Sequence, residues 1–149
     1  YESCACLVGS EMCIRDSYIA IEDSSILAKI ADDFTPSFNS HIIRQAPLLL
    51  AVTFVKGRSG FERDGSFSTK KGDRWQMFDV GAACQTFCLA AHEAGLGTVI
   101  MGIFDEDGLE ELLDIPADRE LGALIAVGYP DIAPEAPKRK SVDELLTYR

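Results

Sequence analysis

The sequence predicts an α+β domain, and three stretches carry the prediction. The first is a long helix at residues 79–94, whose side chains are apolar on nearly every side. The other two are continuous apolar runs that contain β-branched residues, at 48–55 and 121–127, each as long as a buried strand. A helix without a polar face must be covered by protein. We therefore expect one core in which this helix packs on a sheet and is buried all round, in part by a second copy of the chain.

The first predicted elements are short. Residues 18–21 form an apolar run that predicts a strand. A helix follows, capped by Ser24 or Ser25 and continuing through Ile30. Residues 32–40 are predicted to be a loop, because Pro36 interrupts them. The run at 48–55 is interpreted as a central strand.

Residues 56–73 are predicted to form a long surface loop. The segment is rich in glycine, serine and charged side chains, and its large apolar residues are Phe61 and Phe67. A long loop in a compact domain is usually functional or disordered. The two phenylalanines could cover a substrate as a lid, or they could attach the loop to the body of the protein; we favour the second.

Capping signals define the elements of the C-terminal half. Gly95 and Gly97 supply the tight or left-handed backbone that ends the long helix. Asp105 can cap a helix that ends before Pro116. Residues 141–144 match a capping box, so a short C-terminal helix is expected there.

Composition limits the classes of function. The net charge is -10 and the pI about 4.6, which argues against a nucleic-acid partner. No apolar stretch is long enough for a membrane span and no signal peptide is visible, so the cytoplasm is the expected location. Five cysteines give no disulfide framework, and Cys4, Cys6 and Cys13 lack the spacing of a zinc site. Cys84 and Cys88 share a helix face and could chelate a metal, but we interpret them as small core residues and expect no metal.

Several motifs in a fixed order resemble those of one family, the nitroreductase-like flavoproteins. These are homodimeric FMN enzymes that use NAD(P)H. The resemblance extends roughly from Tyr18 to the C-terminus. It implies a mixed, mainly antiparallel sheet flanked by helices. The motifs that carry it are the Asp-x-Gly-Ala-Ala-x-Gln helix with its Gly-Leu-Gly-Thr end (79–98), Met-Gly-Ile-Phe-Asp (101–105), Leu-Leu-Asp-Ile-Pro (112–116), Gly-Tyr-Pro (128–130) and Pro-Lys-Arg-Lys (137–140).

The first seventeen residues do not fit this pattern. Residues 8–17 resemble a translated sequencing-adaptor read, so residues 1–17 are predicted to be non-native and residues 18–149 to form a nitroreductase-like domain. The family's N-terminal Arg-x-Ser-x-Arg flavin contacts have no counterpart here. The domain is therefore expected to be truncated at its N-terminus and to bind FMN weakly.

The resemblance also implies where a flavin would bind. The backbone of Ile100, Met101 and Gly102 matches the segment that the family places against the isoalloxazine ring, with an amide donor toward N5. Glycine suits such a close approach. Lys138, Arg139 and Lys140 match the position that binds the FMN phosphate, although a basic run can equally be a solvated tail. No catalytic side chain is assigned, since flavin chemistry needs little acid–base machinery from the protein.

The expected activity follows from the same resemblance. It is the transfer of electrons from NAD(P)H to nitroaromatics, quinones or similar small acceptors by a ping-pong mechanism, with FMN as cofactor. The expected partner is a second copy of the chain, because the small residues at 81–84 would let two helices approach closely. The alternative is a truncated fragment that dimerises or folds in part without retaining FMN or activity.

Overall fold

The fold is built on a four-stranded sheet in the order β1-β2-β4-β3. The computed structural model describes residues 16–132, 135 and 137–149, so the predicted non-native segment, with its three cysteines, lies outside the described residues except for positions 16 and 17. All three strand pairings are antiparallel, which agrees with the predicted α+β class. The strands are β1 (Asp16–Ile21), β2 (Leu48–Val55), β3 (Gly97–Met101) and β4 (Arg119–Gly128).

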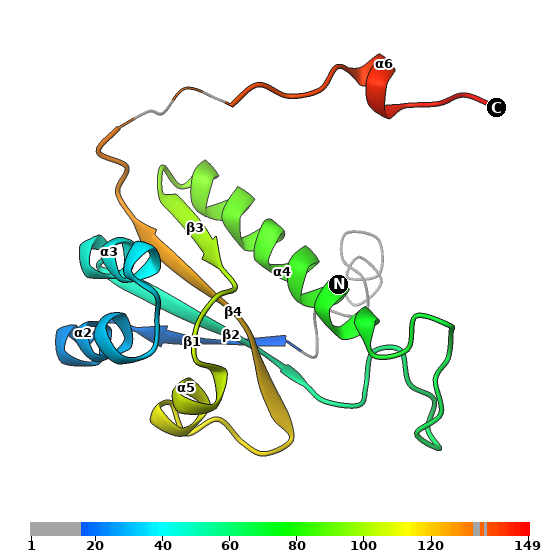
Figure 1. Ribbon diagram of the computed structural model, residues 1–149, viewed down its shortest axis with the longest axis horizontal. Coiled ribbons are helices and arrows are strands. Elements are labelled where there is room, and N and C mark those ends of the chain that lie inside the picture. Colours follow the sequence, from blue (N-terminus) through cyan, green and yellow to red (C-terminus); the bar gives the residue numbers. More distant parts are fainter. Residues whose placement is uncertain (1–15, 133–134, 136) are drawn as a thin grey trace.

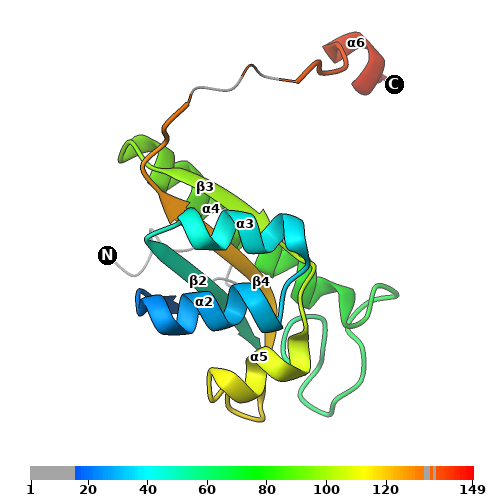
Figure 2. The same ribbon diagram turned by 60° about the vertical axis from the view of Figure 1, so that its left-hand side comes forward.

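Helices cover both faces of the sheet. On one face lie α2 (Ser24–Asp33), α3 (Ser37–Gln45) and α5 (Glu106–Leu112), and on the other lies α4 (Arg74–Glu93), as Figures 1 and 2 show. Successive residues of β2 alternate between the two layers: Leu49 packs with the three-helix layer and Leu50 with α4. A strand buried on both faces has no polar side, which explains the continuous apolar run.

The long helix α4 is buried on one side only. Val80, Ala83 and Cys84 face the sheet and are almost inaccessible to solvent. On the outer side Phe78 and Leu89 remain 59% and 61% exposed. A single chain therefore covers only the sheet-facing stripe of this helix, and burial of the outer side by a second copy stays a prediction. Of the small residues at 81–84, the first two are exposed and the last two face the sheet.

The N-terminal helical region differs from the prediction. Residues 32–40 are not a loop, because α2 continues to Asp33 and α3 starts at Ser37. Pro36 does not interrupt a helix; it precedes one, where its missing N–H removes no helical hydrogen bond. The cap of α2 is Asp23 rather than a serine, since its carboxylate accepts hydrogen bonds from the two amides at positions 25 and 26.

The C-terminal elements largely follow their caps. Gly95 adopts the left-handed conformation expected at the end of α4, with φ of 79°, whereas Gly97 is already part of β3. Asp105 caps α5, and the capping box starts α6 (Val142–Leu145). In Figures 1 and 2 the segment 137–149 extends away from the sheet. No helix of the described chain is long and apolar enough to cross a membrane.

Candidate functional site

The end of β3 presents open backbone. β3 is an edge strand, so in the described chain only β4 pairs with it. Met101 points into the core and is 3% exposed, whereas Ile100 is 46% exposed. Gly102 follows the strand on the surface, and no atom lies within 4 Å of the position that a Cβ would take. The side of Gly102 where other residues carry a Cβ is therefore open to a ligand atom that approaches the backbone.

Two hydrogen bonds from the three-helix layer hold the turn after β3. Asn39, a buried side chain of α3, donates from Nδ2 to the carbonyl oxygen of Ile103 at 2.8 Å. The amide of Asp105 donates to the carbonyl oxygen of Phe34 at 2.8 Å. The turn directly after the open backbone is thus held at two points, and a rigid scaffold presents a binding segment in this way. The sequence did not identify Asn39, because its region was interpreted as a loop.

A second segment, the loop after β2, leaves the sheet in the same direction as the turn after β3. β2 and β3 are both antiparallel to β4, so their C-terminal ends point the same way. The loop 56–73 begins beyond the end of β2, whereas Gly102 follows β3 at the level of the middle of β2, because Met101 and Ala51 both pair with Leu124 (Figure 1). The loop contains a bridge between Phe61 and Phe67, whose rings lie 5.0 Å apart. The two phenylalanines therefore pack on each other, and Phe67 also covers Gly72.

The basic cluster Lys138–Lys140 lies elsewhere. Its three side chains are exposed and line a hollow of about 230 Å³ together with Glu144. Glu144 accepts hydrogen bonds from the amide and hydroxyl of Ser141, and these bonds lower the pKa of its carboxyl group. The hydrogen bonds described for this segment are all local. One chain therefore does not bring the two predicted halves of the flavin site, 100–102 and 138–140, together.

A pair of acidic side chains lies at the α4 face of the sheet. Asp16 and Asp79 line a small cavity with Gln76, and Asp79 is buried. Burial, with a smaller contribution from the charge of Asp79, raises the pKa of Asp16 to about 6. One oxygen of Asp16 is buried without a hydrogen-bond partner among the described residues. Asp79 is the only charged residue between positions 75 and 92, and that isolation was the available sequence signal.

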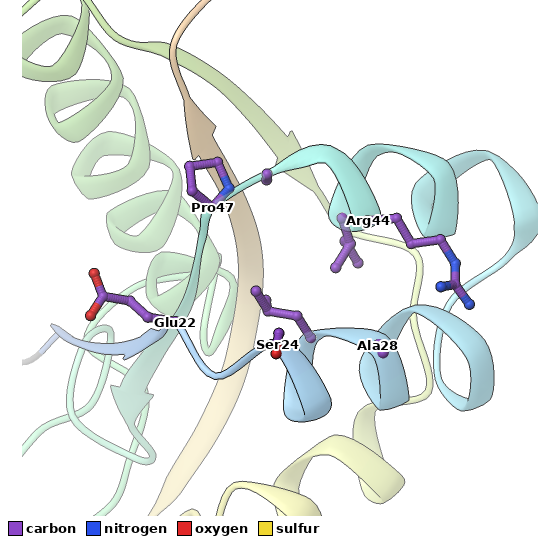
Figure 3. A pocket seen from close by; sticks show the side chains of 8 residues that line it. Glu22, Ser24, Ala28, Arg44 and Pro47 are labelled. Carbon is purple, nitrogen blue, oxygen red and sulfur yellow. The ribbon is translucent and has the colours of Figure 1, made fainter.

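A pocket between α2 and α3 offers little chemistry. It has a volume of about 480 Å³, and Figure 3 shows its lining, which is mainly apolar with Glu22, Ser24 and Arg44 at its edge. Arg44 already forms an ion pair with Asp32. The pocket also lies on the side of the domain away from α4. We therefore do not place the reaction in it.

The histidines and cysteines offer no second centre. Among the described residues, no group of three potential ligands could hold a metal ion. His41 and His92 are both exposed and lie on different helices. Burial raises the pKa of the Cys84 thiol to about 11, with a smaller contribution from Cys88, so this thiol is not an activated nucleophile.

Comparisons with known proteins agree with this architecture. The family model described as "Nitroreductase family" matches residues 18–129. A protein of Archaeoglobus fulgidus, whose name describes an NADH dehydrogenase/NAD(P)H nitroreductase, is 26% identical over 117 residues; these cover 76% of this chain and 60% of that protein. The chain thus spans about three fifths of this relative's length.

Solved structures show the same fold. A nitroreductase family protein from Streptococcus pneumoniae superposes with a TM-score of 0.79 at 20% identity, over 97% of this chain and 84% of that one. An NADPH:FMN oxidoreductase from Vibrio harveyi, solved with NAD+, gives 0.68 at 22% identity, over 94% and 61%. The match of the family model over most of the chain, on this sheet and these helices, shows that the chain belongs to the nitroreductase family.

Proposed function

We propose that this chain is part of an FMN-dependent oxidoreductase that takes electrons from NADH or NADPH. The observation that carries the proposal is the open, clamped backbone at the end of β3, within a chain of the nitroreductase family. A flavin site needs hydrogen-bond donors at one edge of the ring and an open face above it. In this chain the proposed donors are backbone N–H groups rather than ionisable side chains.

The residues fit an FMN only if two copies of the chain cooperate. Gly102 leaves room for a ring to approach the backbone. The phosphate needs cations, and the exposed cluster Lys138–Lys140 extends away from its own domain (Figure 2). We therefore assign the backbone at 100–102 of one subunit and the cations at 138–140 of its partner to one site.

The outer face of α4 supports such a homodimer. It exposes Phe78 and Leu89 beside two residues without bulky side chains, Gly81 and Ala82. Small residues allow close approach of a second helix, and large apolar side chains exposed on one helix face are typical of an interface. The dimer would bury the outer side of the helix that one chain leaves exposed.

The bound flavin would supply the redox chemistry, accepting a hydride from the nicotinamide and returning electrons to an acceptor. The protein's part is to hold the ring by backbone, bind the phosphate and keep one face open for the two substrates in turn. Because the two substrates occupy that face one after the other, the proposed mechanism is ping-pong. Small nitroaromatics and quinones are the proposed acceptors, and the cytoplasm, where NAD(P)H is available, is the proposed location.

The test is a flavin titration followed by a steady-state assay. The purified chain should quench FMN fluorescence in a saturable way and oxidise NADH or NADPH with a quinone acceptor in excess FMN. Turnover should give parallel lines in double-reciprocal plots, as a ping-pong reaction requires. A folded chain that binds no FMN would contradict the proposal and favour the alternative, a fragment without the cofactor.

A further inference from the structure

The loop after β2 and the first residue of α4, residues 56–74, form a basic patch. Residues 56–74 contain six of the chain's 14 Lys and Arg residues and three of its 24 Asp and Glu residues. The segment thus has a net charge of +3 in a chain whose net charge is -10. Such a local reversal of charge attracts anions to this part of the surface.

The patch contains a defined pocket. It has a volume of about 300 Å³ and is lined by Gly57, Arg58, Phe61, Glu62, Arg63 and Gly65. Neither arginine forms an ion pair with another described residue. The two guanidinium groups are therefore available to bind an anion from outside, and an arginine fork matches the geometry of a phosphate group. Phe61 adds an aromatic surface on which a planar base can stack.

The loop is held to α4, so the pocket is formed before any ligand binds. The amide of Gly57 donates to Oε1 of Gln76 at 2.7 Å. The indole of Trp75 donates to the hydroxyl of Thr69 at 2.7 Å, and the ammonium group of Lys71 lies 4.4 Å from the centre of the Trp75 ring. These contacts attach both ends of the loop to the first turns of one helix, which lowers the entropy lost on binding.

We propose that this pocket binds the 2′-phosphate and adenosine of NADPH. The assignment rests on the proposed function: β2 and β3 run in the same direction, and β2 continues four residues beyond the level of Met101, so a long dinucleotide would be needed to reach from the end of β3 to the loop after β2. The pocket is large enough for this part of the dinucleotide and too small for all of it. Two arginines beside one pocket suit a phosphate dianion, which NADH lacks at this position.

The experiment uses a probe that cannot reduce a flavin. Isothermal titration calorimetry of the full chain with 2′,5′-ADP, 5′-AMP and inorganic phosphate measures the affinity of each ligand without any turnover. We expect 2′,5′-ADP to bind about tenfold or more tightly than 5′-AMP. Arg58→Ala and Arg63→Ala should each weaken 2′,5′-ADP by about tenfold. Glu62→Gln should strengthen it, since it removes a negative charge from the pocket wall.

A matched control separates this site from the rest of the surface. Lys29→Ala removes an exposed cation from α2 and should change nothing. Equal affinities for 2′,5′-ADP and 5′-AMP would overturn the proposal, as would affinities indifferent to both arginines. Competition by a single-stranded oligonucleotide with the same arginine dependence would also overturn it, by assigning the pocket to nucleic acid.

The experiments distinguish a failure of the proposed function from a failure of the pocket assignment. If the chain binds 2′,5′-ADP through the arginines and yet NADPH reduces no FMN, the pocket stands and the oxidoreductase proposal falls. If NADPH oxidation proceeds and its KM is the same in Arg58→Ala, Arg63→Ala and the parent, the function stands and the pocket assignment falls. When both are correct, the two variants raise the KM for NADPH and leave the KM for NADH unchanged.

Discussion

The buried side chain of Asn39 donates a hydrogen bond to the carbonyl oxygen of Ile103, 64 residues further along the chain, at 2.8 Å. The bond joins α3 to the turn after β3. α3 supplies no residue to the open backbone at 100–102, but through this bond it fixes the position of the turn that follows. An amide side chain is suited to this because its NH₂ group can donate to a carbonyl.

Asn39→Ala should loosen the turn without unfolding the domain. The loss of one hydrogen bond costs about 1 kcal/mol of unfolding free energy, because the exposed turn can bond to water instead. Hydrogen exchange of the flavin-free protein should show faster exchange of the amides of Gly102 and Ile103. FMN affinity should fall with it. Ser37→Ala, an exposed change on the same helix, is the control. Unchanged exchange at both amides would exclude the positioning role.

The carboxyl group of Asp16 should make the domain less stable as the pH rises. Its pKa is about 6 in the folded chain and near 3.8 in the unfolded chain, so the folded state holds the proton more tightly. The stability that this group contributes is therefore fully present below about pH 4 and is lost as the pH rises through about 6. The full shift corresponds to about 3 kcal/mol, which solvent screening of this half-buried group reduces to roughly 1–2 kcal/mol.

Urea denaturation at pH 4 and pH 7.5 measures this effect. Asp16→Asn should be more stable than the parent at pH 7.5 and nearly equal to it at pH 4. Asp33→Asn, on the exposed surface of α2, should show no such difference. A variant at position 16 that destabilises equally at both pH values would show that the carboxylate carries no electrostatic penalty.

The outer face of α4 should hold two subunits together. Leu89→Glu places a charge on the exposed face and should convert the dimer to a monomer, as measured by analytical ultracentrifugation. Ile26→Glu makes the same change at an exposed apolar residue of α2 and should leave the dimer intact. Ala83 is unsuitable for this test because it faces the sheet and its replacement would disturb the core. A monomeric parent chain at micromolar concentration would contradict the interface.

Most of the fold could be predicted, because its signals are local. The runs at 48–55 and 121–127 have the composition of buried strands, and the caps at Asp105 and Ser141 set their helices. The helix α3 was missed because a proline has two opposite meanings. A proline inside a helix breaks it, whereas a proline directly before the first turn is compatible with a helix start, as Pro36 is here. Only the surrounding backbone conformation distinguishes the two cases.

The site could be predicted only in part. The backbone segment 100–102 and the cations 138–140 were expected, from a family resemblance, to act together. Whether one chain joins them depends on the path of the C-terminal segment, for which local sequence gives no signal. The hydrogen bond from Asn39 to Ile103 joins elements that are distant in the sequence, and the periodicity of apolar residues along the chain does not predict such contacts.

The basic tail should control FMN affinity through the phosphate alone. Replacement of all three cations at 138–140 by alanine removes charge-assisted contacts of about 1.5–3 kcal/mol each, which implies at least a tenfold loss for each contact that forms. Riboflavin, which has no phosphate, should bind parent and variant equally. Fluorescence titration with both flavins measures the difference. An equal loss for riboflavin would mean that the tail stabilises the fold rather than binding phosphate.

Subunit mixing tests most directly the claim that one flavin site is shared between two chains. Gly102→Phe places a ring beside the backbone at a position where an added Cβ lies more than 4 Å from any atom beyond its chain neighbours, and the triple alanine variant of the tail lacks the phosphate cations. Each variant alone should bind FMN poorly. When they are unfolded, mixed in equal amounts and refolded, half of the dimers should be mixed, and each mixed dimer has one intact site. FMN binding should therefore return to about a quarter of the parent's capacity. If no binding returns on mixing, although ultracentrifugation shows mixed dimers, the shared site is wrong.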